Sequence, residues 1–207
     1  MKNLRLLFVL PFVLFIINSA VAQLRIGIVC GRTESKLSLE ELDSLKTDFS
    51  TRTGLGLGAV IDFGSSQFFN IRLEPMYLQK GAEKEINDLE FGPIKSSLNL
   101  SYVELPVLLK LSFNKGGINP YLVGGAAISY LLEAQEEFGD EYLEFGFEKK
   151  QDMKDEFKNL DYGFSYGGGL SIPIGNSSLF AEGRYTEGLT NINDIVGSMV
   201  NIKTRGW

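Results

Sequence analysis

The segment Ser101–Leu111 (SYVELPVLLKL) constrains the fold of this chain more than any other stretch. In an extended strand, successive side chains point to opposite faces. One face of this segment carries only apolar side chains, those of Val103, Leu105, Val107, Leu109 and Leu111. The other face is mixed and carries Tyr102, Glu104, Pro106, Leu108 and Lys110. A soluble sheet buries its apolar face, whereas a membrane barrel turns that face to lipid and the charged face inward. We favour the barrel.

The same alternation predicts further strands near residues 23–31, 51–63, 67–79, 119–131, 161–172 and 178–188. The connections between them are alternately long and short: the short turns are 64–66, 114–117 and 173–176, and residues 80–97 form one of the long, polar connections. Antiparallel neighbours joined in this way place all long loops at one end, which is typical of outer-membrane barrels. The pattern predicts one all-β domain, an antiparallel up-and-down membrane barrel of eight-stranded design.

The eighth strand is the exception in this pattern. Residues 202–207 open it, but the chain stops at Trp207, and a membrane strand needs about 9–11 residues. We therefore expect the last strand to be short or missing, and favour truncation as the reason. Strands one and seven would then be exposed edges, which are a liability for aggregation.

The N-terminus indicates export. Lys2 and Arg5 precede an apolar run over residues 6–17, and small residues follow at Ala20 and Ala22. This order is that of a cleaved signal peptide. We expect residues 1–22 to be removed, leaving an outer-membrane barrel domain of residues 23–207. An uncleaved anchor is the weaker alternative, because the run is shorter than the ~20 residues that span a bilayer.

Composition excludes several classes of function. The chain has no histidine, which excludes His-dependent catalytic triads and His-ligated metals. Its net charge is −6, whereas a nucleic-acid-binding protein carries a basic stripe. The single Cys30 cannot form an internal disulfide. We expect no enzyme activity, cofactor or metal, and membrane lipid rather than nucleic acid as the surroundings.

The charged residues on the mixed faces are the candidate site. They are Asp62, Arg72, Glu74, Glu104, Lys110, Glu182 and Arg184. The interior of an eight-stranded barrel is only wide enough to be filled by side chains, so we interpret these charges as structural ion pairs. The alternative is that Glu74 and Glu104 act as a general acid and base. Pro106 lacks an N–H and predicts a β-bulge in mid-strand.

Two connections have further features. Ser38 and Glu41 have the spacing of a capping box, which predicts a short helix in the first loop. Residues 132–159 form the longest connection, with ten acidic residues against four lysines but without the pattern of a calcium loop. We expect a solvated loop. Its aromatic residues are a possible contact surface for a protein partner: Phe138, Tyr142, Phe145 and Phe147.

At Ser101–Leu111 the chain resembles the PorT-like family of outer-membrane β-barrels from Bacteroidota-type bacteria. The family motif Tyr-x-Glu-Leu-Pro is matched by Tyr102, Glu104, Leu105 and Pro106, and Leu109 and Lys110 continue it. Weaker matches are Pro120-Tyr121 with Gly124-Gly125, Asp161–Gly163 with Gly167–Gly169, and Arg184-Tyr185 followed by Gly188–Ile192. The resemblance covers about residues 24–207. It implies an outer-membrane location and a structural or interaction role, as an accessory of secretion or gliding machinery.

Two other classes of protein fit the alternation. A soluble, secreted lipocalin-like barrel binding an apolar ligand would bury the apolar faces and expose Arg72, Glu74, Glu104 and Lys110. A membrane-embedded lipid enzyme would use Ser/Lys or carboxylate chemistry in place of histidine. Outward-facing Phe and Tyr side chains at the two strand ends would favour the membrane barrel over the lipocalin.

Overall fold

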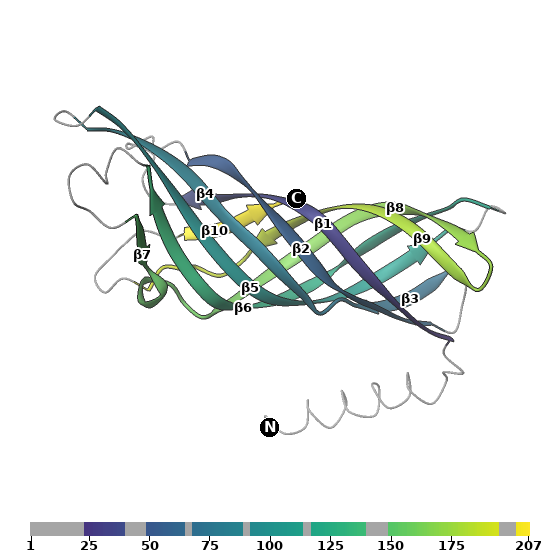
Figure 1. Cartoon of the computed structure of the whole chain (residues 1–207). Coiled ribbons are helices and arrows are strands. Elements are labelled where there is room, and N and C mark those ends of the chain that lie inside the picture. The colour runs from purple at the N-terminus through teal and green to yellow at the C-terminus, as the bar shows by residue number, and fades with distance from the viewer. Residues whose placement is uncertain are drawn as a thin grey trace, which may run out of the picture.

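The computed structural model describes residues 23–39, 49–64, 68–88, 92–113, 117–139, 149–194 and 202–207. The predicted signal peptide lies outside these residues. The strands are β1 (Gln23–Leu39), β2 (Phe49–Gly64), β3 (Phe69–Leu73), β4 (Met76–Asp88), β5 (Gly92–Ser112), β6 (Asn119–Phe138), β7 (Lys150–Asp152), β8 (Leu160–Ile174), β9 (Ser177–Gly188) and β10 (Ile202–Gly206). A 3₁₀ turn, η2 (Lys154–Glu156), follows β7 (Figure 1).

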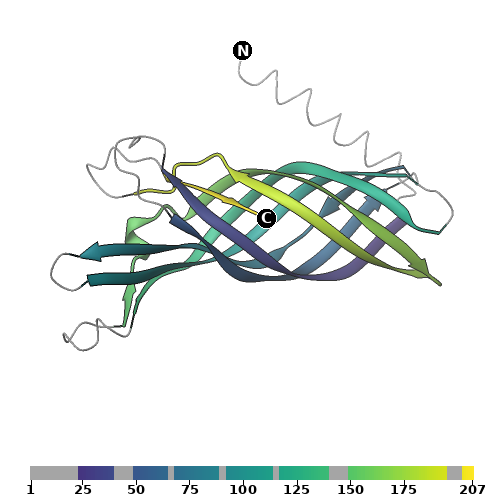
Figure 2. The same cartoon turned by 90° about the horizontal axis from the view of Figure 1, so that it is seen from above.

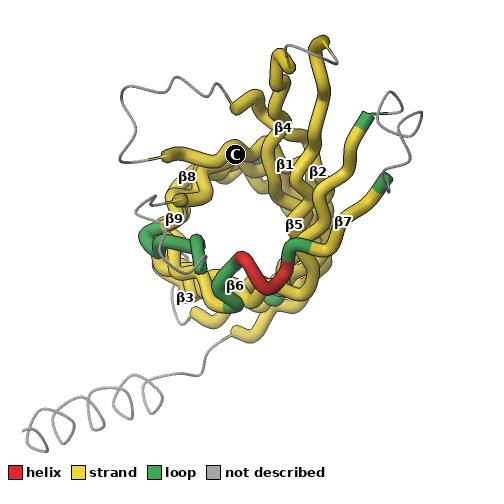
Figure 3. The backbone as a smooth tube through the Cα atoms, turned by 90° about the vertical axis from the view of Figure 1, so that its left-hand side faces the viewer, coloured by secondary structure: helices red, strands yellow, loops and turns green. Residues whose placement is uncertain are grey.

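The strands form an antiparallel ring. Successive positions in the ring pair with each other: β3 and β4 share one position between β2 and β5, β7 and β8 both pair with β6, and β10 pairs back onto β1. Seen end-on, the strands surround the barrel axis, and η2 lies at the rim (Figure 3). The predicted all-β up-and-down architecture is confirmed. We call the end with connections 65–67, 113–118 and 175–176 the turn end, and the opposite end the loop end.

Four strands, β1, β4, β5 and β6, continue well beyond their predicted limits at the loop end. Residues 80–97, expected as a polar connection, are almost entirely the paired arms of β4 and β5, which are joined by residues 89–91. Residues 132–138 likewise extend β6, and β7 pairs with that extension. The prediction that 132–159 is one solvated loop is therefore wrong at both of its ends. Ser38, the expected helix cap, lies in β1 opposite Lys203, while Glu41 lies outside the described residues.

The bulge predicted at Pro106 is not there. Leu73 pairs with Val107 and Met76 pairs with Glu104, so the register is the same on both sides of the break between β3 and β4. Pro106 accepts a hydrogen bond from the Glu74 N–H at 3.2 Å, and its own missing donor costs one ladder bond without shifting the strand. The β5–β6 register instead shifts between Ser101 and Tyr102.

The last strand joins the two ends of the barrel over part of its height. β10 pairs with Ser35–Leu39 of β1 and with two residues of β9, and Trp207 exchanges backbone hydrogen bonds of 2.8 and 3.0 Å with Glu34. Closer to the turn end, β1 is paired with β2 and β9 with β8, and no described strand lies between them. The C-terminus accordingly lies part-way along the wall (Figure 2). β1 and β9 are thus joined at the loop end and are edges at the turn end.

The outer surface of the barrel is apolar, and the charged side chains of the mixed faces lie in the interior. Val103, Leu105 and Leu109 are 40–46% exposed, whereas Arg72, Glu74 and Glu104 are buried. The lipocalin-like alternative requires the opposite arrangement, so the structure does not favour it. No helix among the described residues is long and apolar enough to cross a membrane.

Candidate functional site

Arg72 is the centre of an ion-pair network in the turn-end half of the interior. It lies on β3 and is 1% exposed. Its Nε and Nη2 donate to the two carboxylate oxygens of Asp62, at 2.6 and 3.0 Å, from the adjacent strand β2. Its Nη1 donates to Glu182 at 2.9 Å, across the lumen on β9, and to Glu74 at 3.3 Å. One guanidinium therefore ties three strands together with charge-assisted hydrogen bonds.

Two further cations complete this network. Arg184 Nη2 donates to Glu74 at 2.6 Å and also binds Glu182. Lys110 Nζ donates to Asp62 at 3.0 Å. The network thus holds three carboxylates and three cations, so its formal charge is zero. Such balance matters because a buried charge without a partner is costly.

Aromatic side chains cover this network. The Arg72 guanidinium carbon lies 5.4 Å from the ring centre of Tyr121 and 5.2 Å from that of Phe180, and Lys110 Nζ lies 4.5 Å from the Tyr121 ring. These contacts have the geometry of cation–π interactions. The rings of Tyr121 and Phe180 therefore pack against the cations of the network.

Glu104 does not belong to this network, although the sequence placed it there. It lies nearer the loop end, where its Oε2 accepts hydrogen bonds from Lys80 Nζ at 2.6 Å and Ser129 Oγ at 2.7 Å. Lys80 was missed because it was assigned to a polar connection. The signal that would have found it is the alternation Met76, Leu78, Lys80, Ala82, which continues one face of β4 past Gln79.

The motif residues around Pro106 have distinct positions. Tyr102 is fully buried, and Lys80 Nζ lies 5.2 Å from its ring centre. Glu104 accepts from Lys80, and Pro106 accepts the Glu74 N–H at 3.2 Å. Leu105 points outward and is 40% exposed. The motif thus lines the interior at its first, third and fifth positions and contacts the exterior at its fourth.

An apolar cluster fills the loop-end half of the interior. Its buried members are Leu37, Ala82, Leu100, Tyr102, Leu131, Ala134, Phe157 and Ile192. Two of these come from the connections: Phe157 follows η2 and forms a bridge with Asn193, and Ile192 follows β9. Their backbones are tied, since the Lys158 N–H donates to Ile192 at 2.8 Å. The two connections therefore fold inward over the barrel and close its loop end with side chains.

The outer wall has an aromatic girdle at each end of its apolar band. Near the turn end the exposed aromatics are Phe63, Phe68, Phe69 and Phe113. Nearer the loop end they include Tyr77, Tyr130, Tyr162, Tyr166 and Trp207, and the ring centres of Tyr185 and Trp207 are 4.9 Å apart. Aromatic girdles mark the two membrane–water interfaces in barrels of this kind.

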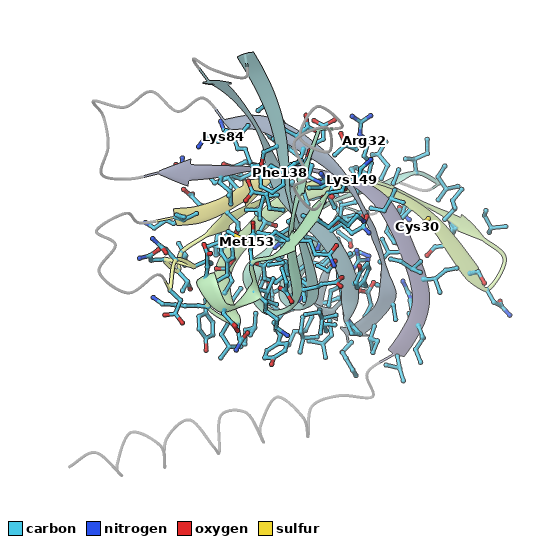
Figure 4. The ribbon with its side chains drawn as sticks, turned by 60° about the vertical axis from the view of Figure 1, so that its left-hand side comes forward. Cys30, Arg32, Lys84, Phe138, Lys149 and Met153 are labelled. Carbon is cyan, nitrogen blue, oxygen red and sulfur yellow. The ribbon has the colours of Figure 1, made fainter. Side chains whose placement is uncertain are left out.

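Beyond the second girdle, β4, β5 and β6 project as a small sheet whose outer edge is β7 (Figure 1). The three residues of β7 are exposed. Phe138 ends β6, and its N–H donates to the carbonyl of Lys149, the residue before β7, at 3.0 Å, so the two ends of the connection between β6 and β7 lie side by side (Figure 4). Tyr142, Phe145 and Phe147 lie outside the described residues. Met153, in contrast, packs against the apolar cluster.

The described residues bear on two kinds of site, a metal centre and an acid–base pair. They contain no group of three or more His, Cys, Asp or Glu side chains suited to holding a metal ion. The two carboxylates considered as an acid–base pair are in different networks, since Glu74 is held by Arg184 and Glu104 by Lys80. Each is saturated by a cation, which opposes proton transfer between them. Cys30 is a free, exposed thiol on the outer wall.

The chain is similar to one family model and to several solved structures. Residues 18–194 match the model of the family described as "Outer membrane protein beta-barrel domain". Among solved structures, Neisserial surface protein A is 12% identical, with a TM-score of 0.49 over 89% of this chain and 94% of that one. Ail, the attachment invasion locus protein of Yersinia pestis, is 14% identical, with a TM-score of 0.40 over 88% of this chain and 92% of that one. A search of curated proteins finds no match.

Proposed function

Because this chain belongs to the outer membrane protein beta-barrel domain family, we propose that it is a membrane scaffold that acts through its loop end rather than as a channel. The observation that carries the proposal is the division of the molecule into a barrel with a filled lumen and a sheet that projects from it. The lumen is filled by the Arg72 network and the apolar cluster, while β4, β5 and β6 project beyond the girdle as a sheet. A filled lumen serves as a rigid support, and the projecting sheet is the part that water-soluble molecules reach.

In this proposal, residues 1–22 are a cleaved signal peptide, and residues 23–207 form the barrel in the outer membrane. The interior charges, Glu104 included, have a structural role and catalyse nothing. The loop end faces the cell exterior, as long loops do in outer-membrane barrels. Residues 132–159 bind a protein partner. The resemblance to PorT-like barrels supports a more specific role, as an accessory of secretion or gliding machinery.

Two experiments test the two parts of this proposal, the filled lumen and the binding of a protein partner. In a planar lipid bilayer, the purified barrel gives no steady ion conductance, because no water-filled path crosses the packed interior. A stable single-channel current would overturn the scaffold proposal. For the partner, residues 140–148 are replaced by a Gly/Ser segment of equal length, and copurification from outer membranes is compared with the unaltered chain.

The matched control replaces residues 195–200, in another loop, in the same way. We expect a specific copurifying protein to be lost only from the 140–148 variant, while both variants keep the heat-dependent gel shift of a folded barrel. If the machinery role is right, the 140–148 variant also fails to restore secretion or gliding in a strain lacking the protein. Equal copurification from all three chains would show that this loop is not the partner site.

A further inference from the structure

β7 is an edge strand of the sheet that projects at the loop end. It pairs with β6 through Lys150, Gln151 and Asp152, and it is the last strand in the order of the sheet. In the end-on view, β7 lies outside the ring of the barrel wall (Figure 3). Its three side chains are all exposed. One edge of β7 is therefore open to molecules in water.

The backbone groups at this open edge belong to Lys150 and Asp152. The Lys149 carbonyl accepts a hydrogen bond from β6 at 3.0 Å, and the Met153 N–H donates one to β6 at 2.9 Å (Figure 4). Alternate residues of an antiparallel strand direct their N–H and C=O groups to opposite sides. Lys149, Gln151 and Met153 thus face β6, whereas Lys150 and Asp152 face away. Among the described residues, no strand pairs with them on that side.

The surface beside the open edge is acidic. Ala134 of β6 is buried in the apolar cluster, so Glu133 and Glu137 lie on the opposite, outer face of the sheet. Lys150 is opposite Glu137, which places Lys150 and Asp152 on that outer face as well. Three carboxylates therefore lie beside one ammonium group.

This charge indicates which kind of strand fits the edge. Residues 132–159 contain ten acidic residues and four lysines, so their net charge is four minus ten, or −6, which equals that of the whole chain. A cationic strand is attracted to such a surface and an acidic one is repelled. A second copy of this chain brings the same negative charge and is therefore disfavoured. Because β7 has only three residues, its backbone supplies few hydrogen bonds, and charge has to contribute to binding.

We propose that the open edge of β7 binds an extended, basic segment of a partner protein, which adds to the projecting sheet as a further strand. The segment exchanges backbone hydrogen bonds with Lys150 and Asp152, and a Lys or Arg side chain opposite Asp152 forms an ion pair with it. In strand addition of this kind, main-chain hydrogen bonds give affinity and alternate side chains give specificity. The inference rests on the proposed function, because it names the chemistry of the partner that residues 132–159 bind.

The test uses the purified, folded barrel in a non-ionic detergent and two short synthetic peptides. In one peptide, lysine alternates with threonine and valine; in the other, glutamate replaces every lysine. Binding is measured by the fluorescence anisotropy of the labelled peptides. We expect the lysine peptide to bind saturably and more weakly as salt screens the charges, and the glutamate peptide not to bind. Binding of both peptides, or of neither, overturns the proposal.

A proline variant separates strand addition from attraction by charge alone. Lys150→Pro replaces an N–H that points away from β6, and proline is tolerated at such edge positions. We expect the lysine peptide to bind about fivefold more weakly, which corresponds to one net hydrogen bond. The matched control, Lys150→Ala, removes the same charge but keeps the N–H, and it binds at least as tightly as the unaltered chain. Equal binding by the two variants overturns the strand addition.

Hydrogen exchange gives a second measurement that needs no variant. The N–H groups of Lys150 and Asp152 exchange more slowly when the lysine peptide is bound, because they then donate to its backbone. Unchanged exchange at saturating peptide overturns the proposal. So does a dimer of the unaltered barrel that Lys150→Pro dissociates, because the edge would then bind a second copy of this chain.

The contribution of charge is tested by a matched pair of double variants. Glu133→Gln with Glu137→Gln removes two carboxylates beside the edge, and we expect the lysine peptide to bind about threefold more weakly. Glu34→Gln with Glu187→Gln removes two carboxylates from the outer wall, where they pair with arginines, and leaves binding unchanged. Equal effects of the two double variants overturn the choice of a basic partner.

These results are independent of the copurification test of the proposed function. If the peptide fails to bind while the 140–148 variant loses its copurifying protein, the partner site stands and the strand addition is overturned. If the peptide binds as expected while copurification is equal from all chains, the strand addition stands and residues 140–148 are not the partner site.

Discussion

Lys80 and Glu104 form an ion pair inside the barrel, with 2.6 Å between Nζ and Oε2. They come from adjacent strands and are nearly inaccessible, with side chains 11% and 4% exposed. The pair lies between the Arg72 network and the apolar cluster, and the ring of Tyr102 covers its loop-end side. This pair therefore separates the polar from the apolar half of the interior.

Lys80→Met is expected to be strongly destabilising. It leaves Glu104 buried with Ser129 as its remaining hydrogen-bond donor, and an unpaired buried charge costs about 3–5 kcal/mol. The free energy of unfolding is measured in lipid vesicles from the folded fraction on unboiled gels as a function of urea. The double variant Lys80→Met with Glu104→Gln removes both charges, and we expect it to recover most of the loss. Equal destabilisation in the single and double variants would contradict the pairing.

Arg72 and Lys110 both donate hydrogen bonds to Asp62, and we expect their contributions to the free energy of unfolding to differ. Arg72→Met and Lys110→Met each leave the network with one excess negative charge, but Arg72→Met also removes hydrogen bonds to three carboxylates. Lys110→Met removes only one hydrogen bond to Asp62, which Arg72 still holds by two. We expect a loss of about 3–5 kcal/mol for Arg72→Met and about 1–3 kcal/mol for Lys110→Met. The same urea titration measures both, and a larger loss for Lys110→Met would show that Arg72 is not the centre.

The alternation of residues was a reliable guide where the barrel wall contacts lipid. There an apolar residue outside alternates with a polar or charged one inside, and β5 followed this pattern as predicted. Beyond the girdle, Gln79 and Glu83 are outward and exposed, so both faces of β4 appear polar and the segment resembles a loop. That is why Lys80 was missed. The absence of a bulge at Pro106 could not be predicted from the sequence either. It depends on the hydrogen bond that the Glu74 N–H donates to the Pro106 carbonyl on the neighbouring strand.

Gly125 occupies a position that tolerates no side chain. It pairs with Leu108, and a Cβ at this position would lie against the backbone of Val107 and Leu108. Gly125→Ala is therefore expected to lower the free energy of unfolding by about 1–3 kcal/mol, the usual cost of overpacking. Gly27→Ala is the control, because nothing lies within 4 Å of a Cβ built there. We expect Gly27→Ala to be neutral or slightly stabilising, since it restricts the unfolded chain. A loss at Gly27 equal to that at Gly125 would contradict this difference.

Cys30 reports directly on the position of the apolar band. It lies on the outer face of β1, between the exposed side chain of Ile28 and that of Arg32. A bimane label on Cys30, in barrels folded into vesicles, is expected to be strongly quenched by lipids with spin labels near the head of the acyl chain. The control moves the label to the exposed β7, with Asp152→Cys in a Cys30→Ser background. There we expect strong quenching by a water-soluble quencher and little by the lipids. If Cys30 behaves like position 152, residues 24–30 of β1 do not face the membrane, and the girdle assignment would be wrong.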